Sequence, residues 1–198
     1  MSDLFVDNIK HQSSQGSGTI NVGASGETVQ AGSGVDNKIG IGDIDYWMTN
    51  ADQSISAGTS TLVSGNWVRV SEDNDFEKTG DGMTVSSGIW TFPRTGKYLI
   101  TFSAEFSGTS SSNYRYVQTQ ILTTNDNSTY DNLSIKTNHY GAESISGFIS
   151  VVNQTIFDVR DTTNYKVKLH VQTINSATLY GVTSDARTQA TWIRLGDT

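Results

Sequence analysis

Apolar and polar residues alternate along much of the chain from residue 46 onward. In the run 97–106, every second residue is apolar or aromatic: Tyr98, Ile100, Phe102, Ala104 and Phe106. Residues at this spacing share one face of a β-strand. Similar runs predict strands at 66–70, 89–92, 114–123, 144–152, 154–159, 165–173, 177–182 and 190–195. Turn-forming residues separate the runs, and no amphipathic helix is evident. The pattern predicts an all-β antiparallel sandwich or jelly roll of roughly eight to ten strands.

The first 45 residues have a different pattern. Gly and Ser recur at 16–18, 23–26 and 32–34, with short β-prone pieces at 4–9, 19–22, 27–30 and 38–41. Such pieces cannot bury a core alone and need a neighbouring chain or surface. A flexible Gly/Ser linker is the alternative. The sequence therefore predicts two parts: a short extended β arm at residues 1–45, and a β domain at residues 46–198.

Composition and charge exclude several classes of protein. The 198 residues include 13 Lys and Arg against 20 Asp and Glu, which gives a net charge of −7. That balance argues against nucleic-acid binding, because gripping a phosphate backbone requires a surplus of cations. Cysteine is absent, which excludes disulfides, thiolate metal sites and a cysteine nucleophile.

The N-terminus shows neither a basic segment nor a long apolar segment, and no window approaches the 18 apolar residues of a membrane span. We therefore expect a protein made in a host cytoplasm without a signal peptide and without membrane insertion. A virion protein can still leave the cell when lysis releases the particle.

Candidate catalytic chemistry is sparse. The three histidines, His11, His139 and His170, are scattered, and none has a partner at metal-ligand spacing. The acidic run 72–75 contains hard oxygen ligands, but it lacks the EF-hand spacing and reads as a solvated turn. We expect no enzyme activity, no catalytic residues, no cofactor and no metal site.

Four tyrosines lie beside Ser/Asn-rich segments, a composition typical of recognition surfaces: Tyr114, Tyr116, Tyr130 and Tyr140. The candidate contact loops are 108–113, 125–130 and 136–141. The four tryptophans lie mostly within alternating runs, so we expect them in the core or in an interface.

The segment 88–102 carries a recognisable motif. An aromatic strand ends in the turn Phe92-Pro93-Arg94-Thr95-Gly96, and Gly96, Tyr98, Ile100 and Phe102 follow at alternate positions. This segment resembles the signature of the C1q/tumour-necrosis-factor-like (C1q/TNF-like) domain, with Ile100 where that family usually has Phe. The resemblance covers residues 46–196 and implies a jelly roll of about ten strands that assembles as a homotrimer.

The N-terminal segment resembles the opening of short fibre and appendage proteins on tailed phages, through residues 4–10 and 18–29. Together the two resemblances imply a virion protein. Residues 1–45 would contact other virion proteins, and an outward trimeric knob would contact a host-surface glycan or protein. The alternatives are a capsid decoration or head-fibre protein, a carbohydrate-active enzyme, and a cellular cytokine-like ligand.

Overall fold

The computed structural model describes residues 42–70, 78–108, 116–139 and 147–198. Most of the predicted arm lies outside these residues. The described part consists of strands, turns and loops, and no membrane-spanning helix occurs in it. The strands there are β1 (Ile44–Thr49), β2 (Gln53–Ile55), β3 (Thr61–Leu62), β4 (Trp67–Arg69), β5 (Lys78–Thr79), β6 (Thr84–Ser86), β7 (Ile89–Thr91), β8 (Gly96–Gly108), β9 (Val117–Thr124), β10 (Asp131–Asn138), β11 (Gly147–Val159), β12 (Lys166–Thr173), β13 (Ala177–Leu179) and β14 (Gln189–Gly196).

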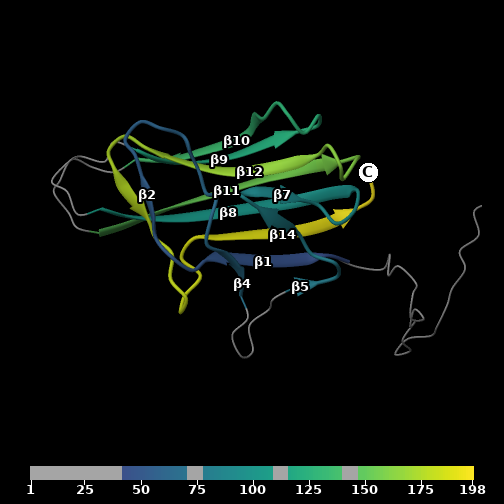
Figure 1. Cartoon of the computed structure of the whole chain (residues 1–198), viewed down its shortest axis with the longest axis horizontal. Helices are drawn as coiled ribbons and strands as arrows, with labels where there is room; N and C mark the ends of the chain where they lie inside the picture. Colours follow the sequence, from purple (N-terminus) through teal and green to yellow (C-terminus); the bar gives the residue numbers. More distant parts are fainter. Residues whose placement is uncertain (1–41, 71–77, 109–115, 140–146) are drawn as a thin grey trace, which may run out of the picture. The chain divides into compact units, whose positions relative to one another are not determined.

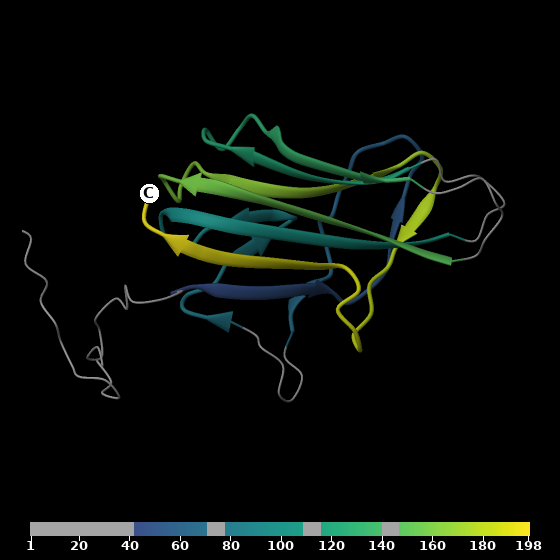
Figure 2. The same ribbon diagram turned by 180° about the vertical axis from the view of Figure 1, so that it is seen from behind.

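The first sheet is built around β8, the central long strand. β11 pairs with β8 along its whole length, from Gly147 opposite Gly108 to Val159 opposite Gly96. Since a strand has two pairing sides, β14 and β13 share the other side of β8. β1 then pairs with β14, and β4 and β5 pair with the far side of β1. Figure 2 shows β8 (teal), β14 (yellow) and β1 (blue) side by side. β11 is therefore an edge strand.

The second sheet has the order β10-β9-β12-β7-β6, with β3 also paired to β12. All described strand pairs in both sheets are antiparallel. Figure 1 shows the two sheets as layers, with β9, β10 and β12 above β8, β14 and β1. The result is an antiparallel sandwich, which confirms the predicted fold class at the level of two packed sheets.

The core between the sheets is strongly aromatic. Trp90 is fully buried and packs against the other three tryptophans, with ring centroids 5.3 Å from Trp47, 5.2 Å from Trp67 and 4.9 Å from Trp192. The predicted inward face of β8 is confirmed, since all five of its alternating residues are at most 1% exposed. Four large rings in contact offset the low apolar content of the chain, because each buries a large area.

A buried asparagine closes the side of the sandwich where the edge strands β10 and β11 meet. Asn153, fully buried on β11, donates through Nδ2 to the backbone oxygens of Thr119 (3.2 Å) and Ser134 (3.1 Å). Its Oδ1 accepts a hydrogen bond from the Ser134 hydroxyl at 2.6 Å. These bonds join β11 of the first sheet to β9 and β10 of the second, and they satisfy the amide inside the core.

The strands differ from the sequence prediction in several places, and the short strands β2, β3, β5 and β6 were not predicted. The predicted strands 144–152 and 154–159 are one strand, β11, because Asn153 continues the ladder opposite Phe102. β10 was not predicted, since it is polar and almost wholly exposed. β1 begins at Ile44, and Asp43 and Asp45 are buried, so the sandwich starts a few residues before the predicted boundary at residue 46.

Candidate functional site

The strand that carries the predicted motif begins at a constrained glycine. Gly96 has φ +144°, a conformation that side chains rarely adopt. A β-carbon there would lie 2.5 Å from both Arg194 Nε and the backbone oxygen of Gly196 on β14. Glycine is therefore required by both backbone conformation and space, and it allows β8 to begin tightly against β14.

The other motif residues are structural. Tyr98, Ile100 and Phe102 point into the core and are at most 1% exposed. The Tyr98 hydroxyl donates to the backbone oxygen of Arg94 at 2.9 Å, so it ties the turn before β8 to the strand. Burial, assisted by the negative charge of Asp43, raises the pKa of Tyr98 to about 12. None of the three is available to a partner.

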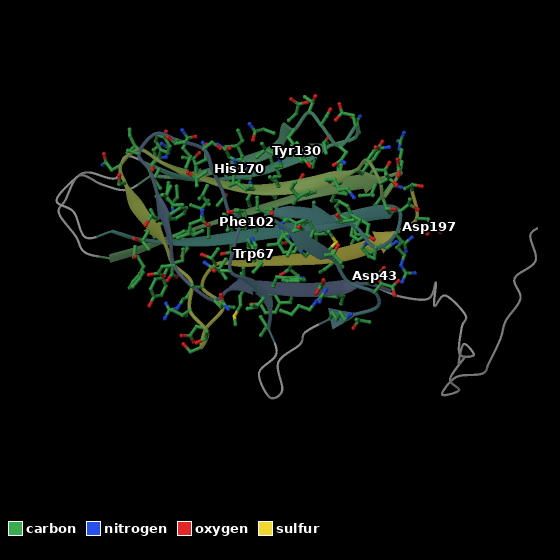
Figure 3. All side chains as sticks on the ribbon, viewed as in Figure 1. Asp43, Trp67, Phe102, Tyr130, His170 and Asp197 are labelled. Carbon is green, nitrogen blue, oxygen red and sulfur yellow. The ribbon has the colours of Figure 1, made fainter. Side chains whose placement is uncertain are left out.

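Two of the four candidate recognition tyrosines, Tyr114 and Tyr140, lie outside the described residues. Tyr116 is half-buried just before β9. Tyr130 is also half-buried, and the Lys168 ammonium lies 3.7 Å from its ring centroid. Burial, together with the charge of Asp126, raises the pKa of Tyr130. Figure 3 places Tyr130 and His170 on the side of the second sheet. Tyr130 is packed on its own fold, and it is not at the tip of a loop.

The candidate contact loops are only partly loops. Residues 125–130 do form a turn between β9 and β10, fixed by Asp126, whose Oδ1 accepts hydrogen bonds from Thr124 Oγ1 (2.6 Å) and from the backbone N–H groups of Ser128 and Thr129 (2.9 Å each). These bonds hold the pKa of Asp126 well below its usual range. Residues 136–138 belong to β10, so that part of the loop prediction is wrong. Residues 109–113 and 140–141 lie outside the described residues.

The outward face of the first sheet carries exposed apolar side chains that the sequence analysis did not single out. On β11, Phe148, Val152 and Ile156 are 58%, 60% and 56% exposed. They lie at alternate positions relative to the buried Val151, Asn153 and Val159, so they point away from the core. Half of the exposed large hydrophobic residues in the described part are on this one strand.

One apolar row crosses four strands of the sheet on that face. The register places Ile156 opposite Leu99, Leu99 opposite Ile193, and Ile193 opposite Ile44. Four aliphatic side chains from β11, β8, β14 and β1 therefore lie next to one another on the outward face. We call this row together with Val152 the apolar face. In a sheet with one solvated face, that face is expected to be polar.

The sequence did contain a signal for this face. β11 is apolar at odd positions such as Ile149, Val151 and Phe157, and also at the even positions Phe148, Val152 and Ile156. A strand that is apolar on both faces is typically covered on both. The signal was hidden because the run was divided into two strands at Asn153.

Charged groups gather at the opposite edge of the sheet, where β1 begins. Arg69 Nε lies 2.9 Å from Asp45 Oδ1 and Arg94 Nε lies 2.9 Å from Asp43 Oδ2, with both carboxylates almost fully buried. The Asp45 carboxylate also accepts the backbone N–H of Met83 at 2.5 Å. These arginine-paired carboxylates hold β1 and β4 to the segment before β6, a structural role.

The part of the chain that the structure describes contains no cluster of His, Cys, Asp or Glu side chains suited to a metal ion. The acidic run 72–75 lies outside that part.

Neither a protein-family model nor a curated protein sequence matches the chain. Solved structures do match. Murine APRIL at pH 5.0 has a TM-score of 0.56 at 13% identity, covering 77% of this chain and 98% of the APRIL chain. Eiger TNF from S. frugiperda has a TM-score of 0.55 at 13% identity, covering 78% of this chain and 93% of the Eiger chain.

Similarity at that level of identity establishes the fold. The chain has a TNF-like jelly-roll fold, which confirms the fold implied by the motif at 88–102. Among the described residues, the apolar face is a surface that a partner could cover.

Proposed function

We propose that the chain is a structural protein of a phage virion. It forms a short trimeric appendage, in which residues 1–45 contact other virion proteins and the β domain is a knob facing a host surface. The apolar face is the observation that supports assembly. The resemblance of residues 4–10 and 18–29 to phage appendage proteins supports the virion.

The apolar face favours a trimer for an energetic reason. A row of aliphatic residues across four strands is costly to leave in water, and burying such area contributes about 25 cal/mol per Å². A second copy of the same chain is the simplest cover, because most soluble oligomers are symmetric assemblies of identical chains. The C1q/TNF resemblance implies that three copies close around the axis.

The described part of the β domain begins and ends at the same end, which leaves the other end free to face a surface. The Asp43 backbone oxygen accepts a hydrogen bond from Arg194 N at 2.9 Å, so the described chain begins beside β14 near the C-terminus. Asp43 and Asp197 lie at the same end of the domain (Figure 3). Ser107, next to the far end of β8, lies about 36 Å from Gly96, because an extended strand rises about 3.3 Å per residue.

Immunogold electron microscopy with an antibody against the knob tests the virion assignment. We expect label on the tail of intact particles purified from a lysate. Label over the head would identify the alternative, a capsid decoration or head-fibre protein. Particles that carry no label would contradict a virion role.

Deletion of residues 1–41 tests the arm. This boundary keeps the buried Asp43 and Asp45, so the knob should fold. It should also form an oligomer of the same number of copies as the full-length chain. We expect the truncated knob to be absent from purified particles. Normal incorporation of the truncated chain would contradict attachment through the arm.

A further inference from the structure

Two aromatic rings lie together near the end of β8 that is far from Asp43. The centroids of Phe148 and Tyr180 are 5.2 Å apart, and their planes meet at 54°. Phe148 lies opposite Ser107 in the β8–β11 ladder. Tyr180 follows β13 directly, and its backbone N–H donates to the oxygen of Glu105 at 2.8 Å. Both rings are therefore held by paired backbone, although the Phe148 ring is largely exposed.

Charged groups border this pair. The Arg187 guanidinium carbon lies 6.0 Å from the Phe148 centroid and 5.7 Å from that of Tyr180. Arg187 Nη1 donates to Glu105 Oε1 at 3.2 Å, and the Ser150 hydroxyl donates to Glu105 Oε2 at 3.3 Å. A carboxylate has about four acceptor positions and a guanidinium has about five N–H donors, so both groups keep unused capacity. We call Phe148, Tyr180, Arg187 and Glu105 the aromatic patch.

The aromatic patch is separate from the apolar face. Along the ladder, the pair Ser150–Glu105 stands between the pairs Val152–Ser103 and Phe148–Ser107. This polar pair and Arg187 form a charged border, and charged residues are depleted from the buried centres of interfaces. The border marks where a contact between copies should end.

We propose that the aromatic patch binds a neutral pyranose sugar of a surface saccharide. An exposed ring offers a flat apolar surface for the C–H face of a pyranose, and neighbouring planar groups that donate and accept hydrogen bonds fix its hydroxyls. The rings and the Glu105 carboxylate are already positioned, so little ordering opposes binding. This names the ligand class of the knob and rests on its proposed adhesive role.

The charge of the patch selects a neutral sugar. Arg187 Nη2 also lies 3.7 Å from Asp185 Oδ2, so two carboxylates surround one guanidinium. The local charge is negative, which disfavours uronic or other acidic sugars. A protein partner is disfavoured by size, because a stable interface requires about 800 Å² from each side, and Phe148 is the one large exposed hydrophobic residue here among those described.

Saturation-transfer NMR on the full-length chain tests the proposal with three probes: lactose, cellotetraose and tetragalacturonate. On irradiation of the aromatic protons, we expect transfer to ring protons of at least one neutral probe and none to tetragalacturonate. The substitution Phe148→Ser should weaken the apparent affinity roughly tenfold. Ile135→Ser, which alters a comparably exposed residue on the second sheet, should leave it unchanged.

Three results would overturn the assignment: no transfer to either neutral probe, equal transfer in Phe148→Ser, or a change of oligomer mass in Phe148→Ser. The last result would place the ring in a contact between copies. Because the measurement uses the isolated chain, its outcome is independent of the immunogold result. Saccharide binding without label on particles would reject the virion role alone, and labelled particles without saccharide binding would reject this site alone.

Discussion

At the scale of single residues, three buried polar side chains of this β domain have specific partners. Tyr98, Asn153 and Asp45 are each almost inaccessible, and each is satisfied by groups from another strand or turn. An unpaired buried polar group costs about 1–3 kcal/mol. These residues therefore fix which strands pack together, in addition to stabilising the fold.

Tyr98→Phe tests the hydroxyl that closes the turn before β8. Loss of its bond to the Arg94 oxygen should lower the free energy of unfolding at pH 7 by about 1 kcal/mol. Because the pKa of Tyr98 is raised to about 12, its stabilising contribution is complete below the unfolded-state value of about 10 and is lost as pH rises toward 12. Urea unfolding at pH 7, 10 and 11 should show the difference between the two proteins narrowing with pH. A difference in unfolding free energy that stays constant from pH 7 to pH 11 would contradict this.

Arg69→Gln tests the buried carboxylate on β1. The substitution leaves Asp45 without its cation and removes the hydrogen bond from Arg69 Nη2 to the Met83 oxygen. We therefore expect the free energy of unfolding to fall by about 3 kcal/mol. The same change at Arg160, whose pair with Asp158 is exposed, provides the control and should cost less than about 1 kcal/mol. If urea unfolding showed the same loss of unfolding free energy for both variants, burial of the Arg69–Asp45 pair would be unimportant.

At the scale of elements, the sequence predicted strands best where they are buried on one face. The run 97–106 alternates cleanly and corresponds to β8, while 165–173 corresponds to β12. β10 was not predicted because an exposed edge strand has no apolar face to mark it. β11 was divided because Asn153, a residue uncommon in cores, interrupts an apolar run.

The candidate site was harder to predict than the fold. Proximity to polar segments suggested Tyr130 as a surface residue, yet it packs beneath Lys168. The apolar face consists of residues from four strands that are distant in sequence and adjacent only through the ladder register. A single sequence does not specify register between strands that are far apart along the chain.

Gly96→Ala tests the start of β8. The positive φ and the 2.5 Å approach to Arg194 Nε and the Gly196 oxygen should make alanine cost about 2 kcal/mol or more. Gly65→Ala is the matched control, because its β-carbon meets no atom within 4 Å, and it should change the unfolding free energy by under about 0.5 kcal/mol. Similar melting temperatures for the two variants would contradict the constraint at Gly96.

At the scale of the whole molecule, the domain has two dissimilar outward faces. The first sheet exposes the apolar face. The outer side of β9 and β12 in the second sheet instead carries a polar network, in which the 5% exposed Gln120 donates to Gln118 Oε1 (2.6 Å) and Gln172 Oε1 (3.2 Å). The exposed Leu133 and Ile135 of that sheet lie on its edge strand β10. This asymmetry is expected if one face contacts other copies and the other meets solvent.

Ile156→Lys tests whether the apolar face holds copies together. A charge within a buried interface should dissociate the oligomer, while the exposed position leaves the monomer folded. Ile135→Lys changes a similarly exposed isoleucine on the second sheet and should leave the assembly intact. Sedimentation of both variants gives the comparison. If only the Ile135 variant lost its assembly, the interface would lie on the second sheet and the proposal would be wrong.

We propose that the apolar face assembles three copies of this jelly roll. Size-exclusion chromatography with multi-angle light scattering on the full-length chain measures that directly. We expect a single species of three times the chain mass of 21.5 kDa. A species of 21.5 kDa that persists at high protein concentration would contradict it.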